Sequence, residues 1–209
     1  MAERTVFTIG RQFGSGGREI GKRLSERLDI PYYDKELLLI AAKDSGFSES
    51  IFAKADEKPS SSLLYSLVMG SYPLSSGATG FNELPINDQL FLYLSNTIKR
   101  IASEGSCVII GRCADYILRD DPSLLSVFVH SPIASRVRRS IDKYGVAPDK
   151  AEDVCHRTDK SRAGFYNYYS DRKWGMARTY DLSLDSSKLG IEGSVDLILS
   201  FCDIARKAR

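Results

Sequence analysis

Apolar residues gather in short blocks along the chain, and the spacing inside each block separates strands from helices. Continuous aliphatic and β-branched runs at 6–10, 107–111 and 124–130 have the pattern of strands buried on both faces of a sheet. Shorter runs at 31–33 and 182–184 also predict strands. The pattern therefore predicts five strands distributed over the whole length of the chain.

Apolar residues at helical spacing fill the intervals between these strands. Ile20, Leu24 and Leu28 recur every four positions and predict a helix directly after the first strand. Further helices are expected at 35–43, 48–58, 88–103, 132–144, 148–162 and 191–209, with Ser131 as the N-cap of the fourth of these. Strands that alternate with helices predict an α/β fold, in which helices cover both faces of a parallel sheet.

One segment breaks this alternation. Residues 59–88 are rich in Ser, Gly and Pro and predict an insertion or a mobile flap. The sequence shows no internal repeat, and 209 residues suffice for one domain with a sizeable core rather than two. We therefore expect a single domain over 1–209.

Composition excludes several function classes. Apolar runs stay far below the roughly 20 residues that span a bilayer, and no secretory signal begins the chain, which predicts a cytoplasmic protein without a membrane partner. The four cysteines form no CxxC pair and the chain has two histidines, His130 and His156. Metal-ligand spacing is therefore absent, and we expect reduced, mostly buried thiols and structural histidines.

Charge is unevenly distributed. The formal net charge is +2, but residues 136–178 carry eleven Lys or Arg against six Asp or Glu. This segment either faces an anionic ligand or forms a solvated helix face. General nucleic-acid binding is not indicated by so small a net charge.

A glycine-rich loop, GRQFGSGGRE at 10–19, follows the first strand. Ligands of open α/β folds bind at the carboxyl ends of the strands, and a helix N-terminus after such a loop directs N–H groups at an anion. The loop therefore predicts a phosphate-binding site, and a structural turn is the alternative. Its candidate binding residues are Arg11, Gly14, Ser15, Gly16, Gly17, Arg18 and Glu19.

The loop departs from the standard P-loop pattern GxxxxGK[ST]. With Gly16 as the second glycine, Arg11 takes the first glycine position and Gly17 the lysine position. Arg18 is then the available cation, and its planar guanidinium could bind phosphate oxygens at two points. Glu19 either acts through a bound magnesium ion or stabilises the helix N-terminus.

Three motifs in order resemble the cytidylate kinase-like family of nucleoside monophosphate kinases. They are TIGRQFGSGGREIGKRLSERLDIPYYDKELL, VIIGRCADYIL, and TDKSRAGFYNYY followed by YDLSLDSSKLGIEGSVDLI. The resemblance implies a P-loop kinase fold with a parallel five-stranded sheet, a monophosphate-binding flap at 35–88 and a lid at 150–178. It also implies ATP with Mg²⁺ as the phosphoryl donor and a nucleoside monophosphate, CMP or dCMP first, as the acceptor.

The resemblance also implies roles for residues outside the loop. Where cytidylate kinases carry GRD, this chain has Gly111, Arg112 and Cys113, with Asp115 as the nearest carboxylate. The implied catalytic residues are Arg18, Arg112, Asp159 and Arg162, and the implied acceptor-binding residues are Asp34, Arg112, Arg157 and Arg162.

Each of these residues also has a purely structural interpretation. Arg112 would be a surface arginine after a strand, and Asp159 with Arg162 would be an exposed ion pair on one helix face. Asp34 would cap a helix. Asp185 either borders the adenine pocket or caps the turn that follows it, and the rings of FYNYY at 165–169 either stack on a base or pack in the core.

Three functions are consistent with these patterns. The first is a kinase that phosphorylates a nucleoside monophosphate or another small acceptor, with no obligate protein partner. The second is a nucleotide-binding regulatory module with little turnover, because the P-loop lysine is missing. The third, ranked last, is single-strand nucleic-acid binding through the basic, Tyr-containing segment.

Overall fold

The five predicted strands form one parallel sheet. The computed structural model describes residues 4–46, 48, 50 and 85–208. The sheet order is β2-β3-β1-β4-β5, with every neighbouring pair parallel. The strands are β1 (Val6–Arg11), β2 (Tyr32–Tyr33), β3 (Cys107–Ile110), β4 (Leu124–His130) and β5 (Leu182–Asp185). The predicted α/β class is confirmed, and β1 lies at the centre of the sheet.

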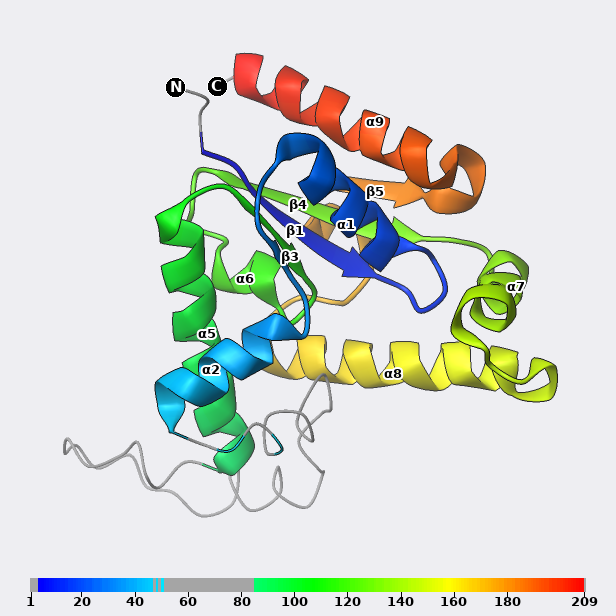
Figure 1. The fold of residues 1–209 in the computed structure, drawn as a ribbon, viewed down its shortest axis with the longest axis horizontal. Helices are drawn as coiled ribbons and strands as arrows, with labels where there is room; N and C mark the ends of the chain where they lie inside the picture. Colours follow the sequence, from blue (N-terminus) through cyan, green and yellow to red (C-terminus); the bar gives the residue numbers. More distant parts are fainter. Residues whose placement is uncertain (1–3, 47, 49, 51–84, 209) are drawn as a thin grey trace.

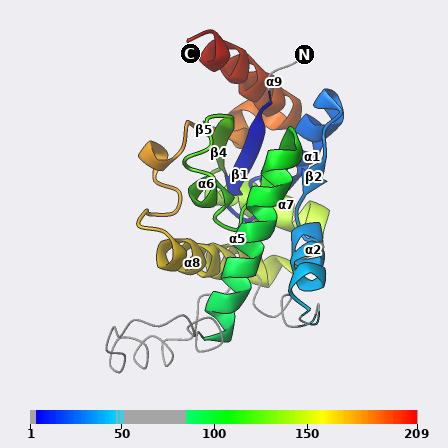
Figure 2. The ribbon, with the colours of Figure 1, turned by 90° about the vertical axis from the view of Figure 1, so that its left-hand side faces the viewer.

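Helices cover both faces of the sheet. They are α1 (Gly17–Leu28), α2 (Glu36–Ser45), α5 (Ile86–Glu104), α6 (Ala114–Ile117), α7 (Ile133–Tyr144), α8 (Ala151–Tyr169) and α9 (Ser186–Lys207), with 3₁₀ turns η1 (Pro148–Lys150) and η2 (Ala177–Thr179). Helices α1 and α9 lie on one face, and α5, α6 and α8 lie on the other (Figure 1). The second view shows α2 alongside α5 (Figure 2).

The two faces of the sheet form two separate cores. Phe7 and Ile9 of β1 pack with Ile20 and Leu24 of α1 and with the inner side of α9. The neighbouring position Val6 belongs to the opposite core, with side chains of α2, α5, α6 and α8. Successive strand side chains point to opposite faces, so an unbroken apolar run supplies both cores at once.

Three predicted helix boundaries are wrong. The C-terminal helix, predicted from residue 191, begins at Ser186. The N-cap of α7 is Pro132 rather than Ser131, whose N–H instead donates to Gln12 Oε1 at 3.1 Å. The predicted helix ending at residue 162 continues as α8 to Tyr169. Phe165 and Tyr166 are buried there, and packing of these rings stabilises the additional turns. Of the FYNYY rings, Phe165 and Tyr166 therefore belong to the core, Tyr169 packs against it and Tyr168 is exposed.

Three further expectations concern the flap, the cysteines and the membrane. The predicted helix 48–58 and most of the flap segment 59–88 lie outside the described residues. All four cysteines are buried free thiols, and burial raises the pKa of Cys107 to about 12. None of the helices among the described residues is long and apolar enough to cross a bilayer.

Asp115 is a buried carboxylate whose structural role is testable. Its Oδ2 accepts a 2.7 Å hydrogen bond from the Tyr166 hydroxyl, and burial raises its pKa despite that bond. A raised pKa means that ionisation costs folding free energy at pH values above the unfolded value near 3.8. The carboxylate therefore destabilises the fold at neutral pH, and this cost disappears as the pH falls through the folded pKa.

Asp115→Asn is therefore expected to increase the free energy of unfolding at pH 7, because the amide oxygen still accepts from Tyr166 without carrying charge. The difference in free energy of unfolding between this variant and wild type should become smaller towards pH 4. Asp115→Ala removes the acceptor and is expected to lower stability by about 1–3 kcal/mol. Urea unfolding at both pH values measures each effect, and an Asn variant less stable than wild type at pH 7 contradicts the assignment.

Candidate functional site

The glycine-rich loop leaves the carboxyl end of β1 and runs directly into α1. Gly14 and Gly16 have φ of +77° and +81°, and Gly16 is the N-cap of α1. A Cβ on Gly14 would lie 2.6 Å from the carbonyl oxygen of Arg136. Glycine is required at Gly14 for both its backbone conformation and this close approach to α7.

Hydrogen bonds from neighbouring elements hold the loop in place. The Ser15 hydroxyl donates to Gln12 O at 2.8 Å, and the Ser186 hydroxyl of α9 donates to Ser15 O at 2.6 Å. The Gln12 N–H donates to Val129 O of β4 at 3.0 Å. The loop is therefore held in place by β4 and α9.

A cavity of about 370 Å³ opens over this loop. Its lining combines loop backbone with cationic and aromatic side chains, chiefly Arg11, Phe13, Gly17, Arg18, Tyr144 and Arg162. The Phe13 and Tyr144 rings lie 5.5 Å apart between their centroids. The cavity combines the first turn of α1, where helix N–H groups favour an anion, with guanidinium groups that also favour one.

Helix α8 reaches the loop through the pair that the sequence placed on one face. The Phe13 N–H donates to Asp159 Oδ1 at 2.7 Å, and Arg162 Nη1 donates to Arg11 O at 3.3 Å. Burial raises the pKa of Asp159, although the Phe13 N–H and the charge of Arg136 favour the carboxylate. The predicted site residues Asp159 and Arg162 therefore contact the loop backbone.

Arg136 is a site residue that sequence reasoning missed. Its Nη1 donates to Asp159 Oδ2 at 2.6 Å and to Phe13 O at 3.2 Å, and its Nε donates to Ser131 O at 3.0 Å. The side chain is 5% exposed. Arg136 lies four residues before buried Ser140 on the inner face of α7, a signal that the surrounding run of arginines obscures.

Asp34 and Arg112, 78 residues apart, are brought together beside the loop. Arg112 Nη1 lies 3.2 Å from Asp34 Oδ1, both side chains are at most 4% exposed, and Arg18 Nη2 pairs with the other carboxylate oxygen. The N-cap of α2 is Lys35, so Asp34 binds arginines instead of capping the helix. Arg112 has φ +55°, and its Nη1 also donates to Ile110 O at 3.2 Å.

The remaining candidates lie elsewhere. Arg157 is 68% exposed and pairs with Asp153 at 2.9 Å on α8. Glu19 pairs with Arg139 of α7. Asp185 caps α9 by accepting from the Ser187 hydroxyl at 2.7 Å and from the Ser187 N–H at 2.9 Å, and these hydrogen bonds lower its pKa. The capping alternative for Asp185 is thus confirmed.

The two histidines lie on different elements, His130 at the end of β4 and His156 on α8. His130 contributes its carbonyl oxygen to the Ser186 hydroxyl at 3.2 Å, and exposed His156 lies 3.6 Å from Glu152. The described residues contain no group of three His, Cys, Asp or Glu side chains that could hold a metal ion.

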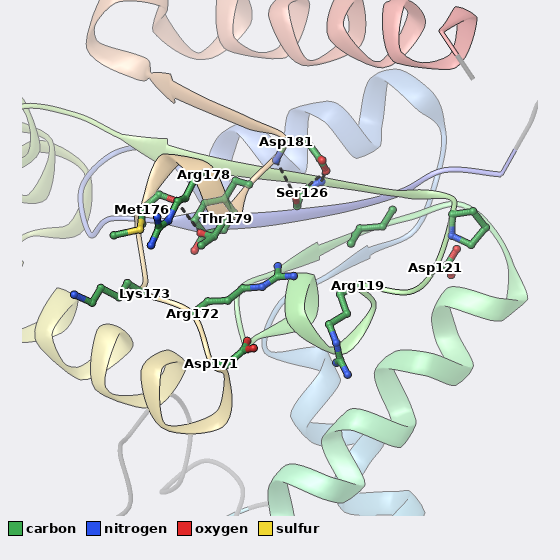
Figure 3. A pocket seen from close by; sticks show the side chains of 13 residues that line it. Arg119, Asp121, Ser126, Asp171, Arg172, Lys173, Met176, Arg178, Thr179 and Asp181 are labelled. Atoms are coloured by element: carbon green, nitrogen blue, oxygen red, sulfur yellow. Dashed lines mark hydrogen bonds between the residues drawn. The ribbon is translucent and has the colours of Figure 1, made fainter.

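A second cavity, of about 740 Å³, lies at the other end of the strands. It is bordered by the first half of β4 and by the segment that leads into β5, where Ser126 donates to Asp181 (Figure 3). Arg119 and Arg172 both lie over the Tyr116 ring, with their Cζ atoms 4.4 and 5.6 Å from the ring centroid. The end of the predicted lid, at 171–178, borders this cavity, but none of the individual residues that the sequence assigned to catalysis or binding does. The smaller cavity at the carboxyl end of β1 is therefore the candidate site.

Comparison with solved structures supports the fold. An uncharacterized protein from Eubacterium ventriosum ATCC 27560 shares 27% identity with a TM-score of 0.70, covering 96% of this chain and 99% of that one. Shikimate kinase from Bacteroides thetaiotaomicron matches with a TM-score of 0.56 at 15% identity, covering 96% and 99%. A gluconokinase from Sinorhizobium meliloti 1021 matches with a TM-score of 0.54 at 14% identity, covering 98% of this chain and 95% of that one. These kinases establish a P-loop kinase fold for this chain.

Comparison of the sequence itself identifies the family. A search of curated proteins finds no match. The model of the cytidylate kinase-like family matches residues 6–188, which contain the loop, Asp34, Arg112 and α8. The chain belongs to the cytidylate kinase-like family.

Proposed function

We propose that this protein transfers the γ-phosphoryl group of ATP to a small acceptor, with a nucleoside monophosphate, CMP or dCMP, as the first candidate. The observation that carries the proposal is the cavity in which Arg18 and Arg162 border the glycine-rich loop at the carboxyl end of β1. Phosphoryl transfer depends on positioning and on cations around the transferring group, and these residues supply both.

The loop residues Gly14, Ser15, Gly16 and Gly17 and the first turn of α1 hold the donor phosphates through backbone N–H groups. Arg18, half exposed at that turn, adds a charge-assisted contact. Helix α8 lies across the loop through Asp159 and Arg162 and keeps water away from the phosphates, as expected of a lid.

The acceptor binds beside Arg18, which borders the cavity and pairs with Asp34 after the end of β2. Arg112, after the end of β3, lies on the other side of Asp34. An oxygen of the acceptor phosphate attacks the γ-phosphorus, the bond to the β–γ bridging oxygen breaks, and ADP leaves with that oxygen. Arg112 is positioned for this role by Asp34, which fixes the orientation of its guanidinium. Arg157, on the exposed side of α8, would contact an acceptor only if α8 moves.

Magnesium fits this site as an ion carried mainly by the nucleotide. Proteins bind Mg²⁺ through one or two carboxylates together with substrate phosphates. Asp34 and Asp159 are paired with arginines in buried sites, whereas Glu19 in the first turn of α1 is half exposed in its pair with Arg139. Glu19 is therefore the carboxylate that would hold the ion, in exchange for its ion pair with Arg139. The ion would neutralise charge on the phosphates.

The test is ADP release from MgATP with CMP, dCMP, UMP, AMP and GMP as acceptors, extended to shikimate and gluconate because kinases of these acceptors share the fold. Acceptor-dependent release by wild type is expected. Arg18→Ala should reduce kcat/KM by about tenfold or more, the effect of one charged hydrogen bond.

Arg23→Ala is the matched control. Arg23 lies on the same helix, is equally exposed, and pairs with Glu192 away from the cavity. Its turnover should equal that of wild type. Equal losses of kcat/KM in both variants would contradict a role for Arg18 in the site.

A second candidate function is nucleotide binding without turnover. Gly17 at the lysine position is the observation that favours it. A rise in melting temperature with MgATP, together with no ADP release for any acceptor, would support this alternative.

A further inference from the structure

Arg11, at the first glycine position of the standard pattern, and Gly17, at its lysine position, are in direct contact in the structure. A Cβ built on Gly17 would lie 2.5 Å from Cβ and 3.1 Å from Cγ of Arg11. The stem of the Arg11 side chain therefore fills the space in which the side chain of a lysine at position 17 would begin. Atoms so close to the backbone cannot move aside as the end of a flexible side chain can.

The charge of Arg11 lies within the candidate site. Arg11 is 5% exposed, ends β1 in register with Val129 of β4, and borders the 370 Å³ cavity with Gly17 and Arg18. Burial raises the pKa of Tyr32, and the charges of Arg18 and Arg11 oppose that rise. The Tyr32 hydroxyl donates to Arg18 O at 3.4 Å, so this group lies at the start of α1.

The two departures from the standard P-loop pattern are therefore coupled. Arginine in place of the first glycine leaves no room for a side chain at position 17, and glycine at position 17 makes room for the arginine. In the standard pattern the lysine after the second glycine reaches the terminal phosphates. Here a cation reaches the same cavity from β1 instead of from α1.

We propose that Arg11 binds the terminal phosphates of the nucleotide in place of the P-loop lysine, with Gly17 as the residue that admits its side chain. This inference rests on the proposed nucleotide site and adds the source of its missing charge. Guanidinium can donate to two phosphate oxygens at once, whereas ammonium acts as a compact charge. The loop then lacks a lysine without lacking its cation.

Titration calorimetry with inorganic triphosphate and with MgATP tests this. Arg11→Met keeps an unbranched stem against Gly17 and removes the charge. Binding of both ligands should weaken by about tenfold or more in a variant that circular dichroism shows to be folded. Arg23→Met, the same exchange at a half-exposed arginine of α1, should bind as wild type does.

The decisive variant moves the cation. In Arg11→Gly the charge and the stem are both absent, so binding should fall as in Arg11→Met. Adding Gly17→Lys to that variant restores the standard pattern at both positions and should return the affinity to within about threefold of wild type, a difference below 1 kcal/mol. Gly17→Ala alone should also weaken binding, because its methyl group displaces Arg11.

The outcomes separate this inference from the proposed function. If wild type binds neither inorganic triphosphate nor MgATP, both the proposed function and the role of Arg11 are wrong. If wild type binds and Arg18→Ala weakens binding but Arg11→Met does not, the nucleotide site stands and the role of Arg11 is wrong. If the folded double variant, checked by circular dichroism, binds no more tightly than Arg11→Gly, the exchange of lysine for arginine is also wrong.

Discussion

Asp34→Ala is expected to lower the free energy of unfolding by about 3 kcal/mol or more. The carboxylate lies between two guanidinium groups, and in the variant Arg112, 3% exposed as a residue, would lose the carboxylate that its Nη1 contacts at 3.2 Å. Removing one partner of a buried ion pair costs about 3–5 kcal/mol. Urea or thermal unfolding measures the loss.

Two further variants test the cause of this effect. Arg18→Ala leaves the pair of Asp34 and Arg112 intact, and because Arg18 is half exposed its removal should cost less than about 1 kcal/mol. Asp34→Leu with Arg112→Met replaces both charges by apolar groups and should recover much of the stability lost in Asp34→Ala. A double variant as unstable as the single one would show that packing, rather than the broken ion pair, is responsible.

Arg136→Met is expected to have the second large effect. It should lower the free energy of unfolding by about 3 kcal/mol at pH 7. The variant loses hydrogen bonds to Ser131 O and Phe13 O and leaves the Asp159 carboxylate with its Phe13 N–H bond but without its nearest cation. Breaking a buried charge pair has costs of this size. The loop and α8 would then be held together less firmly, so ADP release should fall as well.

This loss should depend on pH in a defined direction. The charge of Arg136 opposes the burial that raises the pKa of Asp159, so removing Arg136 raises that pKa further above the unfolded value near 3.8. Ionised Asp159 then costs more stability at neutral pH, and protonation returns part of it as the pH falls. The difference between Arg136→Met and wild type should therefore be smaller at pH 4.5 than at pH 7.

Asp159→Asn is the control for this pH dependence. Its amide oxygen still accepts from the Phe13 N–H but does not titrate. Combined with Arg136→Met, it should remove the extra pH dependence. A difference that stays constant with pH would show that Asp159 does not titrate in this range.

Much of the fold follows from local pattern. The strands, the glycine loop before α1 and the common face of Asp159 and Arg162 all depend on residues within about one or two helical turns, where periodicity is informative. Boundaries were less predictable, because the last turns of α8 are stabilised by buried rings rather than by helix propensity.

The sequence by itself therefore determined a five-stranded parallel sheet with a phosphate-type loop at the end of its first strand. The tertiary structure decided how the charges of the site are distributed. It paired Asp34 with Arg112, buried Arg136 against the loop, and placed the stem of Arg11 over Gly17. Packing in three dimensions fixes such contacts, because the partners come from different elements and no local spacing encodes their distance.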